Sequence, residues 1–468
     1  MTLTFNSNAF EQAASPFVET YKIPGASLGL NHNSKPLYYK GFGYRDKTEK
    51  LPLDADTVFG IASMTKSFAC VAIMHLQDAG KLSVDDQVIK HVPEFKLPSD
   101  GKTEKVSLHH LMTHTTGLPP ISVHNLARKR SIDNDPTAKD YGLDVTKMVG
   151  DPIDTDVQLM EKIASLPVEV LDDPGKAFSY SNEAYGVLGA VVNRASGVSF
   201  ETYVIENILK PANLNNTFFD IAEIEKRDNV TMLYAQKKEA DKKIVYDTPL
   251  WWDAPAMRAA GYLKSTVNDI LTYLEIFRNK GVVGGIRILS EESVEQMTYP
   301  HVEFEPGRYY GYGLRVVPDF FGYKLIEHSG GLKGVSSHMT VIPELGVTGA
   351  LLTNLSSIPA AKLLRGALNV LLEKGFDASS FTYMDYVMSE EKQETCVGTY
   401  TSTEGMKVEI SFEKGKLGIV SEAKFSPLRC VGDFTFISEQ GDVIRFFANE
   451  QGEAERIYYG SRQIAKDK

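Results

Sequence analysis

The spacing of apolar residues in this 468-residue chain changes near residue 376. Before that point, some segments carry apolar residues at helical spacing and others alternate as strands do. After it, short alternating runs meet across polar turns, which is typical of a meander of β-hairpins. We therefore predict a first domain over residues 1–375, a linker over 376–390 and a small, barrel-like all-β domain over 391–468. The chain length also favours more than one structural unit.

The first domain mixes helices with strands rather than alternating them regularly. The pattern predicts a hairpin over 26–44 and strands over 311–316, 337–342 and 347–352. It predicts helices over 63–79, 182–195, 199–209, 267–280 and 357–374. This order favours an α+β fold over a doubly wound parallel sheet. In the last domain, hairpins are predicted where 408–412 meets 416–420 and where 434–437 meets 443–447.

The segment 121–157 is rich in charge and poor in periodicity. Irregular connections of this length are uncommon in compact domains and often cover a functional site. Two interpretations stay open at this point: a lid over a site, or a plain surface insertion.

Composition excludes several classes of function. The formal net charge is -11 and the sequence pI is about 5.5, which disfavours binding to nucleic acid. The short basic run 128–130 is interpreted as solvated surface. No stretch reaches the ~18 consecutive apolar residues of a membrane span. The amino-terminal residues also lack the pattern of a secretory signal, so we expect a cytoplasmic protein without a membrane partner.

Three cysteines are too few for a disulfide framework and fit a reducing compartment. Cys70 lies in an apolar run and is expected in a helix core. A bridge between Cys396 and Cys430 stays open. No cofactor or metal is implied, because His109, His110 and His114 lack the context of a metal site and are expected to pack or form hydrogen bonds.

Ser63 and Lys66 are separated by three residues at the start of an apolar helix. Residues three apart share a helix face, so the lysine can approach the serine hydroxyl and activate it. The helix N-terminus also favours negative charge on that oxygen. The same spacing begins at Ser99, Ser389, Ser411 and Ser421, but none of these opens an apolar helix. Serine is also an ordinary helix cap, which is the alternative for Ser63.

Two further motifs each occur once. Tyr180 and Asn182 precede an apolar helix, and a tyrosine beside a lysine cation can act as a base. The alternative is that Asn182 only caps the helix. His328 and Gly330 lead into predicted strands, where small residues would let a substrate bind along a strand edge. The alternative there is a glycine-rich turn with an incidental histidine.

The combination of Ser63-x-x-Lys66, Tyr180-x-Asn182 and His328-x-Gly330, in this order, resembles the penicillin-binding-protein and class C β-lactamase-like family. The stretches 111–118 and 261–269 resemble further elements of that family. The resemblance covers roughly residues 10–374. It implies a two-lobed fold, with one all-helical lobe, one antiparallel sheet flanked by helices, and the site between them. The last domain resembles the lipocalin-like barrel that some peptidases of the family carry.

The resemblance also implies an acyl-enzyme mechanism on Ser63. Lys66 and Tyr180 would share the proton transfers, and Asn182 would orient the substrate amide and Lys66. The N–H groups of Ser63 and Gly331 would form the oxyanion hole. His328, Gly330 and Gly331 would bind substrate. Many members carry Lys-Thr-Gly where this chain has His328-Ser-Gly330, so a cation whose charge depends on pH is expected there.

These features favour a peptidase or amidase of small or D-amino-acid-containing peptides, such as a D-aminopeptidase, with weak or absent β-lactamase activity. The alternatives are a carboxylesterase or acyltransferase with the same nucleophile, and a catalytically silent binding or sensor protein. The expected partner is a small-molecule or short-peptide substrate, and a homo-oligomer is a hypothesis. The aromatic residues expected either in the pocket or in core packing are Trp251, Trp252, Tyr309 and Tyr310.

Overall fold

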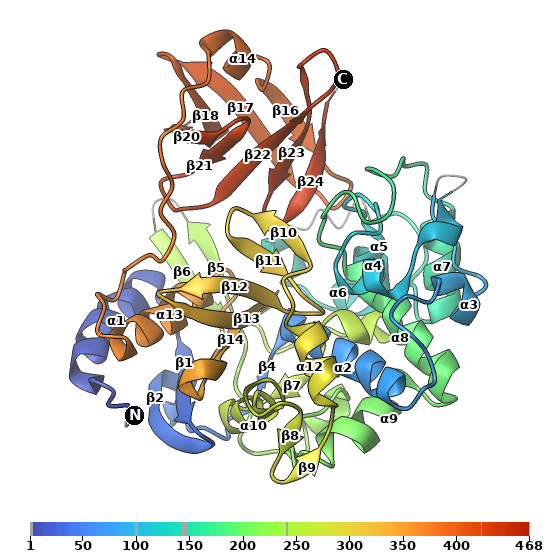
Figure 1. Cartoon of the computed structure of the whole chain (residues 1–468). Coiled ribbons are helices and arrows are strands. Elements are labelled where there is room, and N and C mark those ends of the chain that lie inside the picture. Colours follow the sequence, from blue (N-terminus) through green and yellow to red (C-terminus); the bar gives the residue numbers. More distant parts are fainter. Residues whose placement is uncertain (1–2, 99–101, 142–147, 240–241, 423, 468) are drawn as a thin grey trace.

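The computed structural model describes residues 3–98, 102–141, 148–239, 242–422 and 424–467 (Figure 1). Its first part is built on a nine-stranded antiparallel sheet. In spatial order the strands are β10 (Val302–Glu305), β11 (Arg308–Tyr310), β12 (Arg315–Phe320), β13 (Tyr323–Leu332), β14 (Val335–Ile342), β15 (Val347–Thr353), β1 (Gly25–His32), β2 (Lys35–Asp46) and β3 (Leu51–Pro52). Pairing of β1 with β15 joins the start of this part to its end. The predicted hairpin over 26–44 is confirmed as β1 and β2.

Helices cover both faces of this sheet. On one face, α1 (Ser7–Tyr21) and α13 (Ala360–Leu371) pack side by side (Figure 1), and α13 contacts β14 and β15. On the other face, α10 (Val267–Tyr273) and α11 (Glu275–Arg278) contact the same region of the sheet. Every residue of β14 and β15 is buried, as expected for central strands covered on both sides. The α+β prediction is confirmed.

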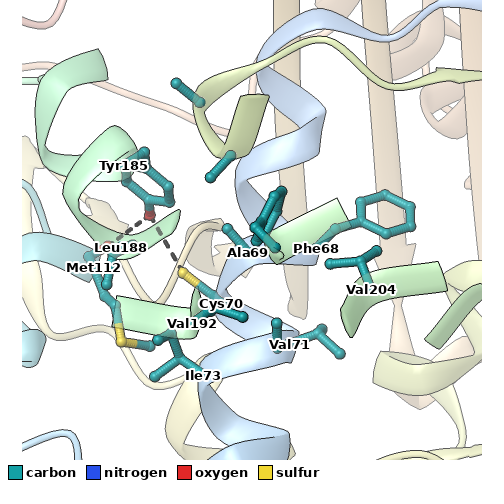
Figure 2. Packing of buried hydrophobic residues seen from close by; sticks show 14 of the residues in the cluster. Phe68, Ala69, Cys70, Val71, Ile73, Met112, Tyr185, Leu188, Val192 and Val204 are labelled. Atoms are coloured by element: carbon teal, nitrogen blue, oxygen red, sulfur yellow. Dashed lines mark hydrogen bonds between the residues drawn. The ribbon is translucent and has the colours of Figure 1, made fainter. Parts of the chain in front are cut away.

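A helical lobe surrounds α2 (Thr65–Asp78), which is apolar on all sides and therefore central. Figure 2 shows Cys70 of α2 among packed side chains, with its sulfur 3.4 Å from the Tyr185 hydroxyl. The helices that follow α2 in this part of the chain are α3 (Val88–His91), α4 (Leu108–Met112), α5 (Val123–Ala127), α6 (Lys129–Asp133), α7 (Asp156–Ala164), α8 (Asn182–Ser196) and α9 (Phe200–Val204). The helix predicted over 199–209 is α9, continued by a π-helical turn over Ile205–Leu209.

All three cysteines are free, so Cys396 and Cys430 form no bridge.

The strand predicted over 311–316 is wrong in its first part. Residues 311–314 form the turn between β11 and β12, and the strand begins at Arg315. Gly313 has a φ of 67°, which favours glycine. A Cβ there would lie 2.8 Å from the Lys66 carbonyl oxygen. The turn therefore packs directly on α2, and Gly313 reflects that close approach rather than strand structure.

A second nine-stranded sheet follows α14 (Glu390–Glu394). In spatial order its strands are β19 (Lys424–Pro427), β18 (Lys416–Ser421), β17 (Lys407–Glu413), β16 (Gly398–Thr401), β24 (Arg462–Lys466), β23 (Ala454–Tyr459), β22 (Val443–Ala448), β21 (Thr435–Ile437) and β20 (Arg429–Gly432). The two edge strands, β19 and β20, are separated in sequence by Leu428 alone, so the sheet curls into a nearly closed barrel (Figure 1). Both predicted hairpins are confirmed.

The remaining elements are short. They are α12 (Glu291–Met297) and the strand pairs β4 (Phe59–Gly60) with β7 (Lys264–Ser265), β5 (Tyr234–Glu239) with β6 (Lys242–Asp247), and β8 (Val282–Val283) with β9 (Ile286–Arg287). Among the described residues, no helix combines the length and the apolar character needed to cross a membrane.

Candidate active site

Ser63 lies in a single 3₁₀ turn, Ala62–Met64, directly before α2. The residue before it, Ala62, has a φ of 46°, a left-handed conformation that is costly for a non-glycine residue. Strain of this kind persists only where the surrounding structure enforces it. Here the turn is enclosed by β13 and β14 on one side and by the segment ending at Gly261 on the other. The hydroxyl of Ser63 is therefore held in a fixed position at the start of the helix.

Lys66 lies in the first turn of α2 and is completely buried. Its Nζ is 3.3 Å from the Ser63 Oγ. It also donates to the Asn182 Oδ1 at 2.8 Å and to the Ala260 carbonyl oxygen at 2.6 Å. Burial lowers the pKa of Lys66 from its ordinary value, and the nearby Arg462 cation also lowers it. These contacts hold the Lys66 Nζ beside the Ser63 hydroxyl. Because its pKa is lowered, Lys66 loses its proton more readily than a solvated lysine does.

Tyr180 and Asn182 flank the start of α8. The helix is capped by Ser181, whose side chain accepts from the Ala184 N–H at 3.1 Å. Asn182 is therefore not the cap, and its side chain faces Lys66 instead. The Lys66 Nζ lies 4.8 Å from the centre of the Tyr180 ring. The first two predicted motifs thus meet at one lysine.

The third motif lies on β13, beside the turn that carries Ser63. A Cβ on Gly330 would lie 2.2 Å from the Ile61 carbonyl oxygen, so this close approach requires glycine. The neighbouring strand adds a hydrogen bond from the Ser337 hydroxyl to that same oxygen at 2.8 Å. Gly331 is exposed on the other side of the strand. Gly330 therefore sets the distance between the sheet and the turn that carries Ser63.

His328 does not behave as the sequence suggested. Its side chain is buried, and its Nε2 lies 3.0 Å from the Tyr310 hydroxyl, which in turn lies 3.1 Å from His114. Burial holds the pKa of His328 well below its ordinary value, and the Arg315 and Lys66 cations act in the same direction. His328 is neutral near pH 7, which corrects the expectation of a charge that changes near neutrality.

The second sheet reaches into the site through the turn between β23 and β24. The carbonyl oxygen of Ser461 accepts from the Tyr180 N–H at 2.9 Å. The Arg462 guanidinium lies 4.8 Å from the centre of the Tyr180 ring and pairs with Glu404 at 3.0 Å. Gln463 donates its side-chain N–H to the Phe178 carbonyl oxygen at 3.1 Å. The small domain thus holds the segment that carries Tyr180.

Ser63 and Tyr180 open onto a pocket of about 500 Å³. Its wall includes His328, Gly330 and Gly331 from β13. Of the four aromatic residues considered above, Trp252 alone is part of the lining, and Tyr310 is packed in the core behind it. The structure therefore brings the predicted site residues together around one cavity, with the buried Lys66 and the half-buried Asn182 behind Ser63.

The segment 121–157 also contributes to the pocket, through Arg128 and Tyr141. Arg128 corrects the interpretation of the run 128–130 as solvated surface, because its guanidinium turns inward while Arg130 is exposed. Part of the predicted lid, 142–147, lies outside the described residues.

Comparison with known proteins decides the family. The model of the Beta-lactamase family matches residues 10–371, which is most of the chain. The chain belongs to the beta-lactamase family. This confirms the resemblance drawn from the three motifs, and the family names a common fold rather than a reaction of this chain.

Relatives of this beta-lactamase-family chain include Protein flp of Staphylococcus aureus (strain COL), 28% identical over 352 residues. The match covers 73% of this chain and 62% of that protein, so the chain spans less than two thirds of the relative's length. The octameric penicillin-binding protein homologue from Pyrococcus abyssi is 28% identical, with a TM-score of 0.70, over 98% of this chain and all of that one. A D-stereospecific amidohydrolase from Streptomyces sp. shares the fold at 21% identity, with a TM-score of 0.61, over 78% of this chain and 98% of that one.

Sequence reasoning missed three arginines of this beta-lactamase-family site: Arg128, Arg315 and Arg462. The first lies in a charged segment without periodicity, and the other two lie on strands where a charged residue usually marks the solvent side. Nothing in their local pattern distinguishes them. Arg462 in particular lies in the predicted second domain, so its contact with Tyr180 depends on how the two sheets pack against each other.

Proposed function

We propose that this protein is a serine hydrolase that acts through an acyl-enzyme on Ser63, and that it is a peptidase or amidase of small or D-amino-acid-containing peptides. The observation that carries the proposal is the position of Lys66. It is fully buried, and its Nζ is 3.3 Å from the Ser63 Oγ. A buried lysine with a lowered pKa, held beside a hydroxyl, is suited to removing the hydroxyl proton.

In the proposed reaction, the Ser63 Oγ attacks the substrate carbonyl carbon while its proton passes to Lys66. Tyr180, with its ring against Lys66, shares the transfer and delivers a proton to the leaving nitrogen or oxygen. The N–H groups of Ser63 and Gly331 bind the developing oxyanion. Water then attacks the acyl-enzyme, the same groups return the proton to Ser63, and the acid leaves. Asn182 holds Lys66 in place through its Oδ1 and contacts the substrate amide.

We also propose weak or absent β-lactam hydrolysis. The third motif offers a neutral, buried His328 where many members of the family carry a lysine, so the carboxylate of a β-lactam would meet no cation at that position, whatever cations lie elsewhere in the pocket. The division into domains at 375 and 391 and a homo-oligomeric state are further proposals. The latter is supported by the octameric state that the name of the Pyrococcus abyssi homologue gives that protein. Light scattering that finds a monomer at all concentrations contradicts it.

A substrate panel tests the proposed activity. Purified protein is assayed with p-nitrophenyl esters and with aminoacyl and D-peptidyl anilides, and we expect the anilides to be cleaved. Ser63→Ala should lose this activity by at least about 10³-fold, because the nucleophile is gone. Ser411→Ala is a matched control, since Ser411 has the same spacing to a lysine but lies on β17 of the second sheet. Cleavage of esters alone favours an esterase, and an active Ser63→Ala variant contradicts the proposal.

A further inference from the structure

The pocket in front of Ser63 is electropositive although the protein carries a net charge of -11. Its charged lining residues are Arg128, Arg315 and Lys333. Within the part of the chain that the structure describes, no aspartate or glutamate lines this pocket. A cavity lined by one sign of charge attracts a ligand of the opposite sign.

Lys333 is already neutralised and does not contribute to this attraction. It forms a buried ion pair with Asp135, and both side chains are 1% exposed. Asp135 also accepts from the Trp252 Nε1 at 2.8 Å. The positive charge available to a ligand therefore comes from the two arginines.

Arg128 comes from the junction of α5 and α6, on the helical side of the pocket. Its Nη2 donates to the Asn125 Oδ1 at 2.5 Å, and its guanidinium lies 5.3 Å from the centre of the Trp252 ring. Its Nε is buried and lacks a hydrogen-bond partner among the described residues. Glu183 and Glu404 act on Arg128 through space, but neither forms an ion pair with it.

Arg315 comes from the first residue of β12, on the sheet side of the pocket. Its Nη2 donates to the Ser461 hydroxyl at 3.2 Å, and its guanidinium lies 5.3 Å from the centre of the Phe304 ring. Its Nε is also buried without a partner in the described ranges. Two guanidinium groups thus line the same pocket, one from the helical lobe and one from the sheet, and the hydrogen bonds described above join each to a neutral side chain.

We propose that Arg128 and Arg315 bind a carboxylate of the substrate, so that the enzyme selects peptides or amides that carry a free carboxylate. This rests on the proposed function of Ser63 for the reaction, although the binding itself does not. A planar guanidinium matches a carboxylate through two parallel hydrogen bonds. Arg128 and Arg315 lie outside the three motifs. They would bind the carboxylate in place of the third motif, where His328 is neutral. The carboxylate is either the C-terminus of the substrate or an acidic side chain.

Calorimetric binding to Ser63→Ala protein tests this without turnover. The first ligand pair is N-acetyl-D-alanine against N-acetyl-D-alaninamide. The second pair is N-acetyl-D-glutamate α-amide against N-acetyl-D-glutamine α-amide. We expect the acid of at least one pair to bind about tenfold or more tightly than its neutral partner, as one charge-assisted hydrogen bond supplies. The pair that shows the preference identifies the C-terminal or the side-chain carboxylate.

Arg128→Gln and Arg315→Gln, each added to Ser63→Ala, should reduce that preference at least about fivefold. Arg130→Gln is the matched control, because Arg130 is exposed, pairs with Asp154 and lies two residues from Arg128. Equal binding of acid and amide in both pairs overturns the proposal. So does a preference that survives in both arginine variants, or one that Arg130→Gln also removes. The hydrolase proposal is tested separately with a fluorophosphonate probe on the unmodified protein. If that proposal is wrong, Ser63 is not labelled.

Discussion

At the scale of single residues, the site depends on how one buried lysine is held. Lys66 contacts the Ser63 hydroxyl, the Asn182 side chain and the Ala260 carbonyl oxygen. Burial lowers its pKa, and the Arg462 cation, 4.8 Å from the centre of the Tyr180 ring, acts in the same direction. As a base, Lys66 works in its neutral form, so activity is expected to rise as pH rises through its pKa.

We predict that Arg462→Gln moves this rising limb to higher pH. Removing a cation near Lys66 makes its protonated form more favourable, which raises its pKa and delays the loss of the proton. The measurement is kcat/KM against pH for both proteins. Arg429→Gln is the control, since Arg429 is on the same sheet but exposed and paired with Asp385. If the rising limb of kcat/KM against pH lies at the same pH in Arg462→Gln as in the unmodified protein, this arginine has no electrostatic role.

At the scale of elements, β13 and the turn of Ser63 fit together because Gly330 has no side chain. The sequence motif alone suggested small residues for substrate access, whereas the structure gives a packing reason for one of them. An added Cβ on Gly330 would meet the Ile61 carbonyl oxygen at 2.2 Å and the Ser337 Oγ at 2.4 Å. Backbone oxygen atoms cannot move aside as a flexible side chain can, so the strand or the turn would have to shift.

Gly330→Ala should therefore lower the free energy of unfolding by about 1–3 kcal/mol, as overpacking does in well-packed cores. It should also lower kcat, because the turn that shifts carries Ser63. Chemical denaturation and steady-state kinetics measure the two effects. Gly331→Ala is the control for stability, since a Cβ there would meet no atom within 4 Å. Equal stability of the two variants would contradict the packing account.

At the scale of the whole molecule, two sheets cooperate at one site. The turn between β23 and β24 binds the segment that carries Tyr180 through the Ser461 carbonyl oxygen and the Gln463 side chain. The connection between the two parts is more loosely packed. Met384 is 84% exposed and Val387 is 93% exposed, and residues 381–389 form neither helix nor strand.

Cutting this connection should leave the molecule assembled. We predict that a protease site inserted between Met384 and Val387 is cleaved without separating the two fragments on size exclusion, and that most of the activity is retained. The contacts at Tyr180 and Phe178, rather than the covalent link, hold the parts together. Fragments that separate while the first one remains fully active would show that the second sheet is not part of the site.

The sequence predicted the fold class, and it predicted seven candidate site residues that the structure brings close together, because each rests on a local pattern. Helical periodicity marks α2 and α8, strand-like apolar runs mark β14 and β15, and the three motifs have fixed spacing. The pattern failed at residues 311–314, where Gly313 belongs to a turn packed on α2 rather than to a strand. It also failed for Arg128 and Arg462, whose positions depend on contacts between segments far apart in the chain. The charge of His328 could not be predicted either, because it depends on burial.

The central claim is that Ser63 becomes covalently acylated, and the most direct measurement is mass spectrometry after reaction with a fluorophosphonate probe. The probe reacts with an activated serine hydroxyl, so its adduct reports the nucleophile itself. We predict one adduct, located by peptide mapping on Ser63 and absent in Ser63→Ala, with labelling slowed in Lys66→Ala. An unlabelled Ser63, together with unchanged hydrolysis by the Ser63→Ala variant, would contradict the account.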